Sequence, residues 1–499
     1  MKKSINNIFY GILGQILTIV IGLLLPRLRI VSFGSEVNGM LSSIQQIYTY
    51  LALLEAGVGS ATLQALYGPV ARNSRKEINE ILAATNHYYK KTGIVYLVFV
   101  IIFAIFYPLM IASNIPTITI VEVILLNGLG NVLAYFFQGK YRILLQAEGK
   151  QYIITNLTTF VTVCSGLVKI LLINLQFDVV SLQIAFFTFN LLQVIFFAWY
   201  IKKNYKWINL KVKKNENAIS QKNSVLVHQI AEMVFNNTDV LILTVFCGLK
   251  VVSVYALYNM VFDMVSTLIA NINTGFSFKL GQLYNSNRKR FDKMYNCYER
   301  YYMAISFSLY CVAFSFIKPF IKLYTSGITD IEYLMRYLPI LFTIIKLMVS
   351  GRALCGFLLS YAAQFRKTQN RAIIEAGLNL GVSIISVRFL GIYGVLLGTI
   401  VALFYRANDM IIYANLKLLK RNPWYTYRWW ILNGIIFSLC SIIFSRLKIE
   451  IQSYQQFFYL VICYAIITIS IFVGITYLFS KDITHQWIRT DWKLPSKSE

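Results

Sequence analysis

The chain has 499 residues, of which 57% are hydrophobic and only 14% are charged, whereas soluble globular domains carry about 25% charged residues. This composition excludes an ordinary soluble protein and predicts several membrane-spanning helices. The formal net charge of +26 would also fit a nucleic-acid-binding protein, so the positions of the basic residues must separate the two classes.

Apolar stretches recur along the chain, each close to the roughly 20 residues that a helix needs to cross the hydrocarbon layer. The first follows the basic start "MKKSINN" and has no small-residue cleavage site behind it, so we expect an uncleaved span rather than a signal peptide. The expected spans, about fourteen by the length rule, lie near residues 8–30, 39–64, 92–112, 118–139, 152–174, 180–201, 224–247, 252–279, 301–322, 334–362, 372–390, 392–413, 429–445 and 455–480. The predicted fold class is an all-α polytopic membrane protein.

Lys and Arg are distributed unevenly between the two sets of alternate loops. The N-terminus, the C-terminus and one set of loops are rich in them, as in "KKNYKWINLKVKK", whereas the opposite set holds only Lys250, Arg446 and Lys448. Cytoplasmic loops carry such an excess, so we expect both termini on the cytoplasmic side of a bacterial inner membrane. This asymmetry accounts for most of the charge, and we expect no nucleic-acid partner.

Metal and enzyme chemistry are both disfavoured. Seven cysteines without CxxC spacing and only three histidines indicate neither a disulfide framework nor a metal centre, and we expect no cofactor. The outward loops, such as "SNIPTIT" and "QFDVV", are too short to hold a catalytic domain. The sequence therefore predicts a protein that is not an enzyme.

The two halves of the chain resemble each other weakly. "GSATLQALY" (59–67) is similar to "GFSFKLGQLY" (275–284), and both occupy the same place in a run of six spans. Parallel repeats around a central cavity are a transporter plan; chance similarity between apolar segments is the alternative. The predicted domains are a six-helix bundle at 1–201, a basic linker at 202–223, a second six-helix bundle at 224–415, accessory helices at 429–480 and a cytoplasmic tail at 481–499.

Polar and acidic residues form helical stripes inside several spans. A carboxylate at the bilayer centre costs roughly 2.5–3.5 kcal/mol or more, so Glu55 in "LLEAGVGSA" must be stabilised or used by the folded protein. Interhelical hydrogen-bond seams are the structural alternative, particularly for the amides. The stripes contain Gln45, Glu55, Glu232, Asn236, Asp239, Asn259, Asp263 and Asn379.

Cations also fall inside the expected spans: Arg29, Lys169, Lys346, Arg352, Arg388 and Arg406. Arg388 and Arg406 are best placed to extend toward an interface. Lys346 is too central for that. It needs a carboxylate partner, a water-filled cavity or an anionic substrate.

Several stretches resemble the polysaccharide-transporter (Wzx-type flippase) branch of the multidrug/oligosaccharidyl-lipid/polysaccharide exporter superfamily. Their order and spacing over residues 1–415 carry the resemblance more than any single motif. They are "GSEVNGM" followed by "LLEAGVGSA", "LLQAEGKQYIITN", "NNTDVLILTVFCGLKVVSVYALY" and "EAGLNLGVSIISVRFLGIYGVLLGTIVA".

The resemblance implies two six-helix bundles around a cavity that opens alternately to each side. It implies a flippase for a polyprenyl-diphosphate-linked oligosaccharide, used in making a surface polysaccharide such as O-antigen or capsule, with membrane lipids and polysaccharide-assembly proteins as partners. The expected roles are diphosphate binding for Lys346, Arg29, Arg352 and Lys169, coupling to H⁺ or Na⁺ for Glu55, Asp239, Asp263 and Glu232, and sugar binding for Asn236, Asn259, Asn379 and Gln45. The accessory helices would hold a lipid tail or only pack.

Three other functions stay open from the sequence. A cation-coupled drug exporter would want an acidic, apolar cavity, which the buried cations argue against. A membrane-embedded glycan polymerase or ligase would want a large outer loop. A non-transporting scaffold of the assembly complex is the third.

The loop charges give a topology that can be tested with reporter fusions. Reporters fused after residues 212 and 290 are expected to be cytoplasmic, and those after residues 115 and 328 extracytoplasmic. An extracytoplasmic signal from the fusion after residue 212 would contradict the whole orientation.

Overall fold

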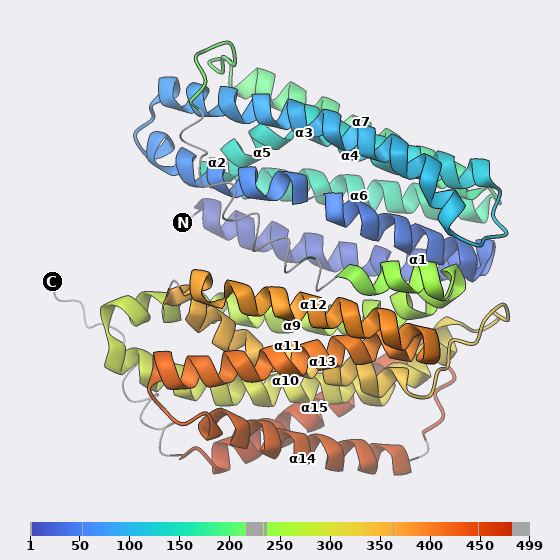
Figure 1. Ribbon diagram of the computed structural model, residues 1–499, viewed down its shortest axis with the longest axis vertical. Helices are drawn as coiled ribbons and strands as arrows, with labels where there is room; N and C mark the ends of the chain where they lie inside the picture. The colour runs from blue at the N-terminus through green and yellow to red at the C-terminus, as the bar shows by residue number, and fades with distance from the viewer. Residues whose placement is uncertain are drawn as a thin grey trace. The chain divides into compact units, whose positions relative to one another are not determined.

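The computed structural model describes residues 2–51, 53–215, 233, 237–362, 364–447 and 449–481, and its regular elements within these ranges are helices (Figure 1). The helices are α1 (Lys2–Leu51), α2 (Leu53–Ala71), α3 (Arg75–Met110), α4 (Thr117–Phe137), α5 (Gly139–Ala147), α6 (Gln151–Asn174), α7 (Val179–Asn204), α9 (Leu249–Ser286), α10 (Arg288–Tyr324), α11 (Leu338–Tyr361), α12 (Phe365–Leu390), α13 (Ile392–Tyr413), α14 (Trp424–Arg446) and α15 (Tyr454–Leu478). A π-helix covers Ala414–Leu419 and a short apolar helix covers Asn237–Phe246.

The predicted all-α polytopic membrane fold is confirmed. Among the described residues, 12 helices are long and apolar enough to cross a membrane. α1 counts once among them although it consists of two helices that meet at Gly34, and Asn237–Phe246 lies within the expected seventh span. The expected spans therefore all have helical counterparts, including the pair 372–390 and 392–413, which Gly391 separates.

The first outward connection is shorter than predicted. The sequence predicts a loop over 31–38, but the backbone is helical on both sides of Gly34, whose φ of 84° lies in the left-handed region that favours glycine. The carboxylate of Asp330 accepts hydrogen bonds from the backbone N–H of Ser35 (2.8 Å) and from its hydroxyl (2.7 Å). This is the geometry of an N-terminal helix cap, and it lets the second half of α1 begin directly after the turn.

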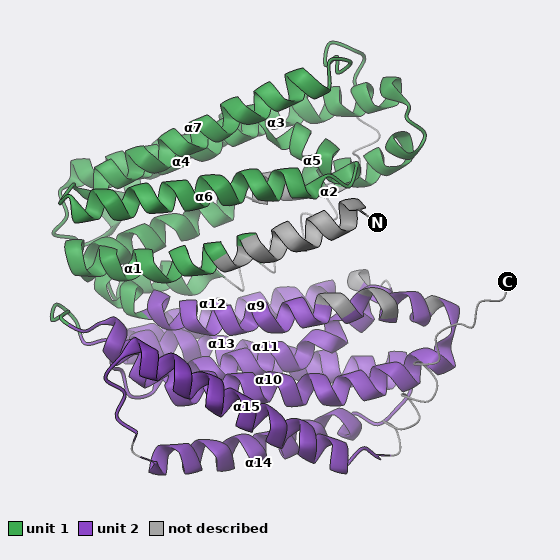
Figure 2. Cartoon of the chain, turned by 180° about the vertical axis from the view of Figure 1, so that it is seen from behind, with its two compact units in different colours: residues 1–254, 327–331 green, residues 255–326, 332–499 purple. Residues whose placement is uncertain are grey.

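The chain divides into two compact units, coloured separately in Figure 2. Unit 1 contains Met1–Val254 with Gly327–Ile331, and unit 2 contains Tyr255–Ser326 with Glu332–Glu499. The described helix of the expected seventh span, Asn237–Phe246, falls within unit 1. The predicted boundaries of the repeated bundles stay a prediction.

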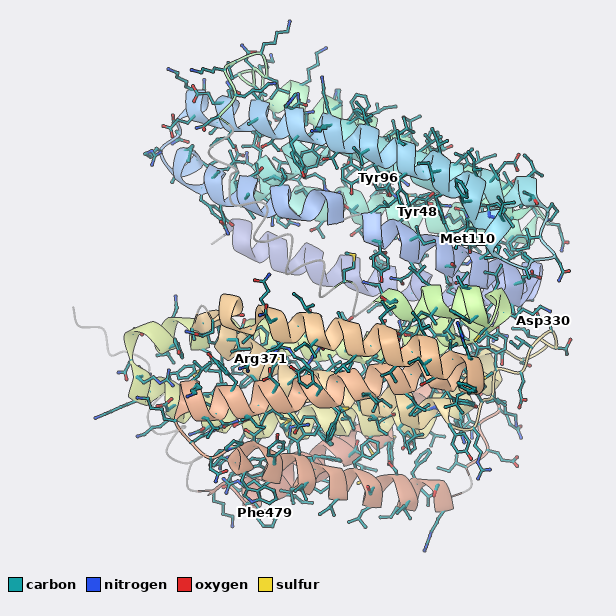
Figure 3. All side chains as sticks on the ribbon, in the orientation of Figure 1. Tyr48, Tyr96, Met110, Asp330, Arg371 and Phe479 are labelled. Carbon is teal, nitrogen blue, oxygen red and sulfur yellow. The ribbon has the colours of Figure 1, made fainter. Side chains whose placement is uncertain are left out.

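Buried tyrosines organise the core of unit 1. The rings of Tyr48 and Tyr96 lie 6.3 Å apart, and that of Tyr135 lies 5.0 Å from Tyr96; Figure 3 labels the first two. The Tyr48 hydroxyl donates a 2.5 Å hydrogen bond to the backbone carbonyl of Ile124. A buried hydroxyl must find such an acceptor, so this bond fixes α1 against α4.

The C-terminal helices are an integral part of unit 2. Met303, Phe307 and Cys311 of α10 pack in one buried cluster with Ile436 of α14 and Phe472 of α15. On its outer side α14 keeps a row of exposed apolar residues one helical turn apart, namely Ile431, Ile435, Leu439 and Ile442. One face of α14 therefore packs on unit 2, and the other has the composition of a lipid-facing surface.

Gly39 allows a close approach inside unit 1. A Cβ atom at this position would lie 1.7 Å from the backbone oxygen of Leu249. We expect Gly39→Ala to lower the thermal midpoint of the purified protein in detergent, because the helix backbones must separate; overpacking costs about 1–3 kcal/mol. Gly22→Ala is the matched control, since a Cβ atom at Gly22 would have no neighbour within 4 Å. Equal midpoints for the two variants would contradict the close contact.

Candidate functional site

Lys346 of α11 meets a carboxylate and an amide of α9. Its ammonium lies 2.6 Å from Asp263 Oδ1 and 3.2 Å from Asn259 Oδ1, while the Asn259 amide donates a 2.6 Å hydrogen bond to Asp263 Oδ2. Asn259 and Asp263 are four residues apart and therefore share a helix face. Three residues with separate predicted roles thus form one cluster.

This cluster is open on one side. The Asp263 side chain is 50% exposed and that of Lys346 is 15% exposed. Thr267 continues the face one turn further along α9. A carboxylate in a spanning helix cannot face hydrocarbon without a large penalty, so this side of unit 2 is suited to water or to a polar ligand.

A second ionic network links α11, α12 and α13. Glu375 is 7% exposed and lies between the Arg352 guanidinium, which donates to Oε1, and Arg406, whose Nε lies 3.3 Å from Oε2. Arg406 Nη1 lies 2.8 Å from Asp409 Oδ2, and Arg371 Nη1 lies 2.6 Å from Asp409 Oδ1. Figure 3 labels Arg371 at one end of this chain of charges.

The network contains three guanidinium groups and two carboxylates. Arg352, expected to hold a diphosphate, already has a carboxylate partner. Arg406 does not extend to an interface as the sequence suggests: its side chain is only 9% exposed because Glu375 and Asp409 neutralise it inside the protein. Arg388 lies at the exposed end of α12, in agreement with the prediction.

Unit 1 brings two of the predicted cations together. Arg29 of α1 and Lys169 of α6 lie close enough for their like charges to interact. The Lys169 ammonium also lies 4.7 Å from the centre of the Phe186 ring on α7, a cation–π contact. Both side chains are half-buried. Both predicted cations of unit 1 are thus partly buried on spanning helices, where an anion near them would be stabilised.

The remaining predicted residues are dispersed. Glu232, Asn236 and the side chain of Glu55 lie outside the described residues. Asp239 is buried near Tyr50, and Gln45 is exposed on α1. Asn379 is 1% exposed and donates a 2.9 Å hydrogen bond to Thr399, which is the interhelical seam that the sequence leaves open as the structural alternative.

The sequence pattern places Gln45, Tyr48, Gly59 and Thr62 on the helix face of Glu55; Gln45 is exposed, and the other three pack inside unit 1. Tyr48 lies in the core, the Thr62 and Thr85 hydroxyls are 3.0 Å apart, and a Cβ at Gly59 would lie 3.8 Å from the Tyr89 hydroxyl. Both threonines are fully buried. Tyr48, Gly59 and Thr62 on this face therefore contribute to helix packing in unit 1.

Two polar clusters at helix ends were not assigned a role from the sequence. In unit 2, Arg421 donates to Glu299 (2.6 Å), which is 1% exposed. In unit 1, Tyr205 donates to Glu148 (2.5 Å) beside Lys150, in the motif "LLQAEGK". Burial and the Glu148 carboxylate raise the pKa of Tyr205, so its hydroxyl stays protonated and anchors the segment after α7. The motif "LLQAEGK" is the sequence signal that could have identified this cluster.

Metal binding finds no support in the described part of the chain. No group of three or more His, Cys, Asp or Glu side chains there could hold a metal ion.

The buried network predicts a clear stability effect. We expect Glu375→Gln to lower the free energy of unfolding by about 3 kcal/mol, because breaking a buried pair leaves two guanidinium groups without their shared carboxylate. Asp263→Asn is the control, since that carboxylate is half-exposed and its loss should cost less. Thermal unfolding of both purified variants measures the difference; a larger loss for Asp263→Asn would contradict the assignment of Glu375 as the structural carboxylate.

Comparisons with known proteins agree with this architecture. Residues 225–385 match the MatE family model, and no curated protein matches the sequence. The structure is similar to "Lipid II flippase MurJ, inward closed conformation", with a TM-score of 0.69 at 14% identity over 96% of this chain and 100% of that chain.

Multidrug transporter structures are similar over a smaller share of the chain. An inward-facing multidrug resistance MATE family transporter of the MOP superfamily has a TM-score of 0.61 at 15% identity, over 77% of this chain and 93% of its own. An outward-facing multidrug resistance MATE family transporter has a TM-score of 0.55 at 16% identity, over 83% of this chain and 95% of its own. The chain thus has the helical fold shared by MurJ and the MATE transporters, and a MatE-type segment at its centre.

Proposed function

We propose that this protein is a flippase of the multidrug/oligosaccharidyl-lipid/polysaccharide exporter superfamily. It moves a polyprenyl-diphosphate-linked oligosaccharide from the cytoplasmic to the outer leaflet by alternating access, without catalysing a reaction. The observation that carries the proposal is the presence of two partly buried cations, Arg29 and Lys169, on the spanning helices α1 and α6 of unit 1. Ionisable side chains kept inside spanning helices mark substrate and ion pathways, and cations suit an anionic substrate.

The substrate has the charge that these residues need. A diphosphate carries negative charge and several acceptor oxygens, and charge-assisted hydrogen bonds to ammonium and guanidinium groups are the strong ones. Lys169 contributes a mobile point charge, whereas Arg29 contributes a planar fork that can bind phosphate through two N–H groups.

Lys346 contributes an exchangeable contact in unit 2. The Lys346 ammonium lies 2.6 Å from the Asp263 carboxylate. A phosphate oxygen that replaces Asp263 as the partner of Lys346 would leave this carboxylate without its cation. Asp263 is half-exposed, so it could then take up H⁺ or Na⁺. This exchange couples substrate binding to ion binding in one cluster, with Asn259 and Thr267 available for sugar hydroxyls.

The extent of the structural similarity supports a lipid-linked substrate. The match to the MurJ structure covers 96% of this chain, so at least part of the two C-terminal helices falls within it, whereas the two multidrug transporter structures described above cover 77% and 83%. Besides packing on α10, α14 and α15 are then available to hold a lipid tail.

A second candidate function is the export of organic cations. The half-exposed carboxylate of Asp263 favours it, since a cationic substrate could displace Lys346 as its partner. The cations Arg29 and Lys169 in the spans of unit 1 count against it, because like charges repel a cationic substrate.

Substitution of the cations tests the proposal. We expect Lys169→Gln and Arg29→Gln each to weaken substrate binding by a few kcal/mol, so that lipid-linked oligosaccharide accumulates on the cytoplasmic leaflet of cells that depend on the variant. Lys346→Gln should do the same through loss of its phosphate contact.

Arg388→Gln is the control, because Arg388 is an exposed cation at the end of α12. Protein levels in the membrane are compared in parallel. Lipid distribution like that of the control in all three variants, at normal protein levels, would remove the basis for an anionic substrate.

A further inference from the structure

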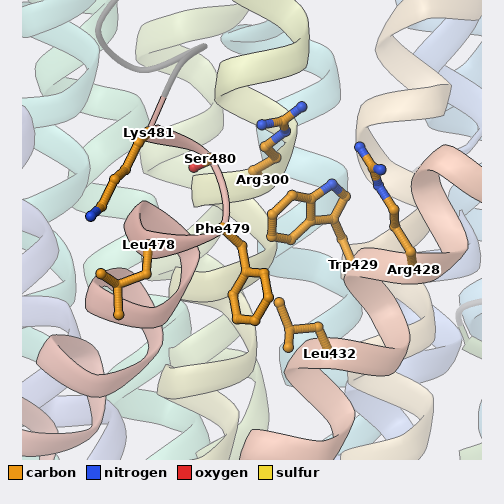
Figure 4. A pocket seen from close by; sticks show the side chains of 8 residues that line it. All are labelled: Arg300, Arg428, Trp429, Leu432, Leu478, Phe479, Ser480 and Lys481. Atoms are coloured by element: carbon orange, nitrogen blue, oxygen red, sulfur yellow. The ribbon is translucent and has the colours of Figure 1, made fainter.

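A cavity of about 580 Å³ opens where α14 begins and α15 ends in unit 2, beside Arg300 of α10 (Figure 4). It does not include the Lys346 and Glu375 clusters, but it adjoins the Arg421–Glu299 cluster: the Arg300 guanidinium donates to the Tyr425 hydroxyl, and the Arg421 guanidinium lies 4.4 Å from the Tyr425 ring centre. Its lining residues are Arg300, Arg428, Trp429, Leu432, Leu478, Phe479, Ser480 and Lys481. Three of them are cations, and none of the eight is acidic, so the cavity concentrates positive charge over an apolar floor.

Two donors in this cavity are buried without an acceptor. Arg300 and Trp429 are each 3% exposed, and neither the Nε–H of Arg300 nor the Nε1–H of Trp429 finds a hydrogen-bond partner within the described part of the chain. A buried donor left unsatisfied costs about 1–3 kcal/mol. Both atoms belong to lining residues, so an acceptor in the cavity would remove the penalty at both sites together.

Aromatic rings fix the cations around this position. The Arg300 guanidinium lies 5.0 Å from the Trp429 ring centre, and the Arg428 guanidinium lies 5.7 Å from the same ring and 4.1 Å from that of Tyr425. Figure 4 shows the indole nitrogen of Trp429 directed toward the side on which both guanidinium groups lie. The donors are thus held in place before any ligand binds.

An apolar track leads away from the cations. Leu432 and Phe479 form the floor, and the exposed row Ile431, Ile435, Leu439 and Ile442 continues along α14. The cavity lies where α14 begins and α15 ends, which the loop charges predict to be the cytoplasmic face. A phosphate group with an attached acyl chain matches both the cationic rim and the track.

We propose that this cavity binds the phosphate of an anionic membrane phospholipid, with its acyl chain lying along α14. Arg428 and Lys481 contact the phosphate from the rim, and the Arg300 and Trp429 N–H groups donate to its oxygens from within. The bound lipid completes the packing of the C-terminal helices on α10. This site does not depend on the proposed flippase activity, and a protein that transports nothing would still bind the lipid.

Native mass spectrometry of the purified full-length chain tests the site, with phosphatidylglycerol, phosphatidylcholine or glycerol 1-phosphate added. We expect phosphatidylglycerol to bind in preference to phosphatidylcholine, and Arg428→Gln to weaken it about tenfold, the value of one charge-assisted hydrogen bond. Trp429→Phe, which keeps the ring and removes the N–H, should weaken it by a smaller factor. Glycerol 1-phosphate should not compete.

Lys203→Gln is the matched control, because Lys203 is an exposed cation stacked on Trp199 at 4.9 Å, also at a helix end but in unit 1. Its phosphatidylglycerol affinity should equal that of the unchanged protein. Two results would overturn the proposal: equal affinities for Arg428→Gln and Lys203→Gln, or competition by glycerol 1-phosphate at concentrations similar to the lipid's, which would assign the cavity to a soluble anion.

Discussion

The cost of placing charge in hydrocarbon determines how this protein is built. Each ionised side chain in a span needs an opposite charge, water or a ligand. In unit 2 carboxylates of the protein supply most of the opposite charge. Glu375 and Asp409 neutralise Arg352, Arg371 and Arg406 across three helices. Lys346 has Asp263, but in an open position. The difference between these two clusters separates structural charge from charge that is available for function.

The same distinction explains why the two units contribute differently to the proposed mechanism. The cations of unit 1, Arg29 and Lys169, lie near each other, and a bound diphosphate would reduce their repulsion. The pair in unit 2 can exchange one partner for another at Asp263.

The all-α membrane fold could be predicted from the sequence, because the length and apolar composition of each span are read directly from it. The ion pairs between helices were harder to predict, since they depend on how each helix is rotated and on which distant segments contact each other. Arg406 shows this: its position near a helix end suggested an interface, while its partner Glu375 is supplied by a different helix. Asn259 and Asp263 were predictable as one face of α9, but the arrival of Lys346 from α11 was not. The donors of Arg300 and Trp429 carry no sequence signal at all.

Transport by the purified protein in proteoliposomes tests the central claim most directly, with a fluorescent polyprenyl-diphosphate oligosaccharide and a fluorescent organic cation compared in the same preparation. We expect the diphosphate lipid to appear in the opposite leaflet at a rate that protein-free vesicles do not reach, and the organic cation not to be moved. Movement of the cation without movement of the diphosphate lipid would contradict the proposed function.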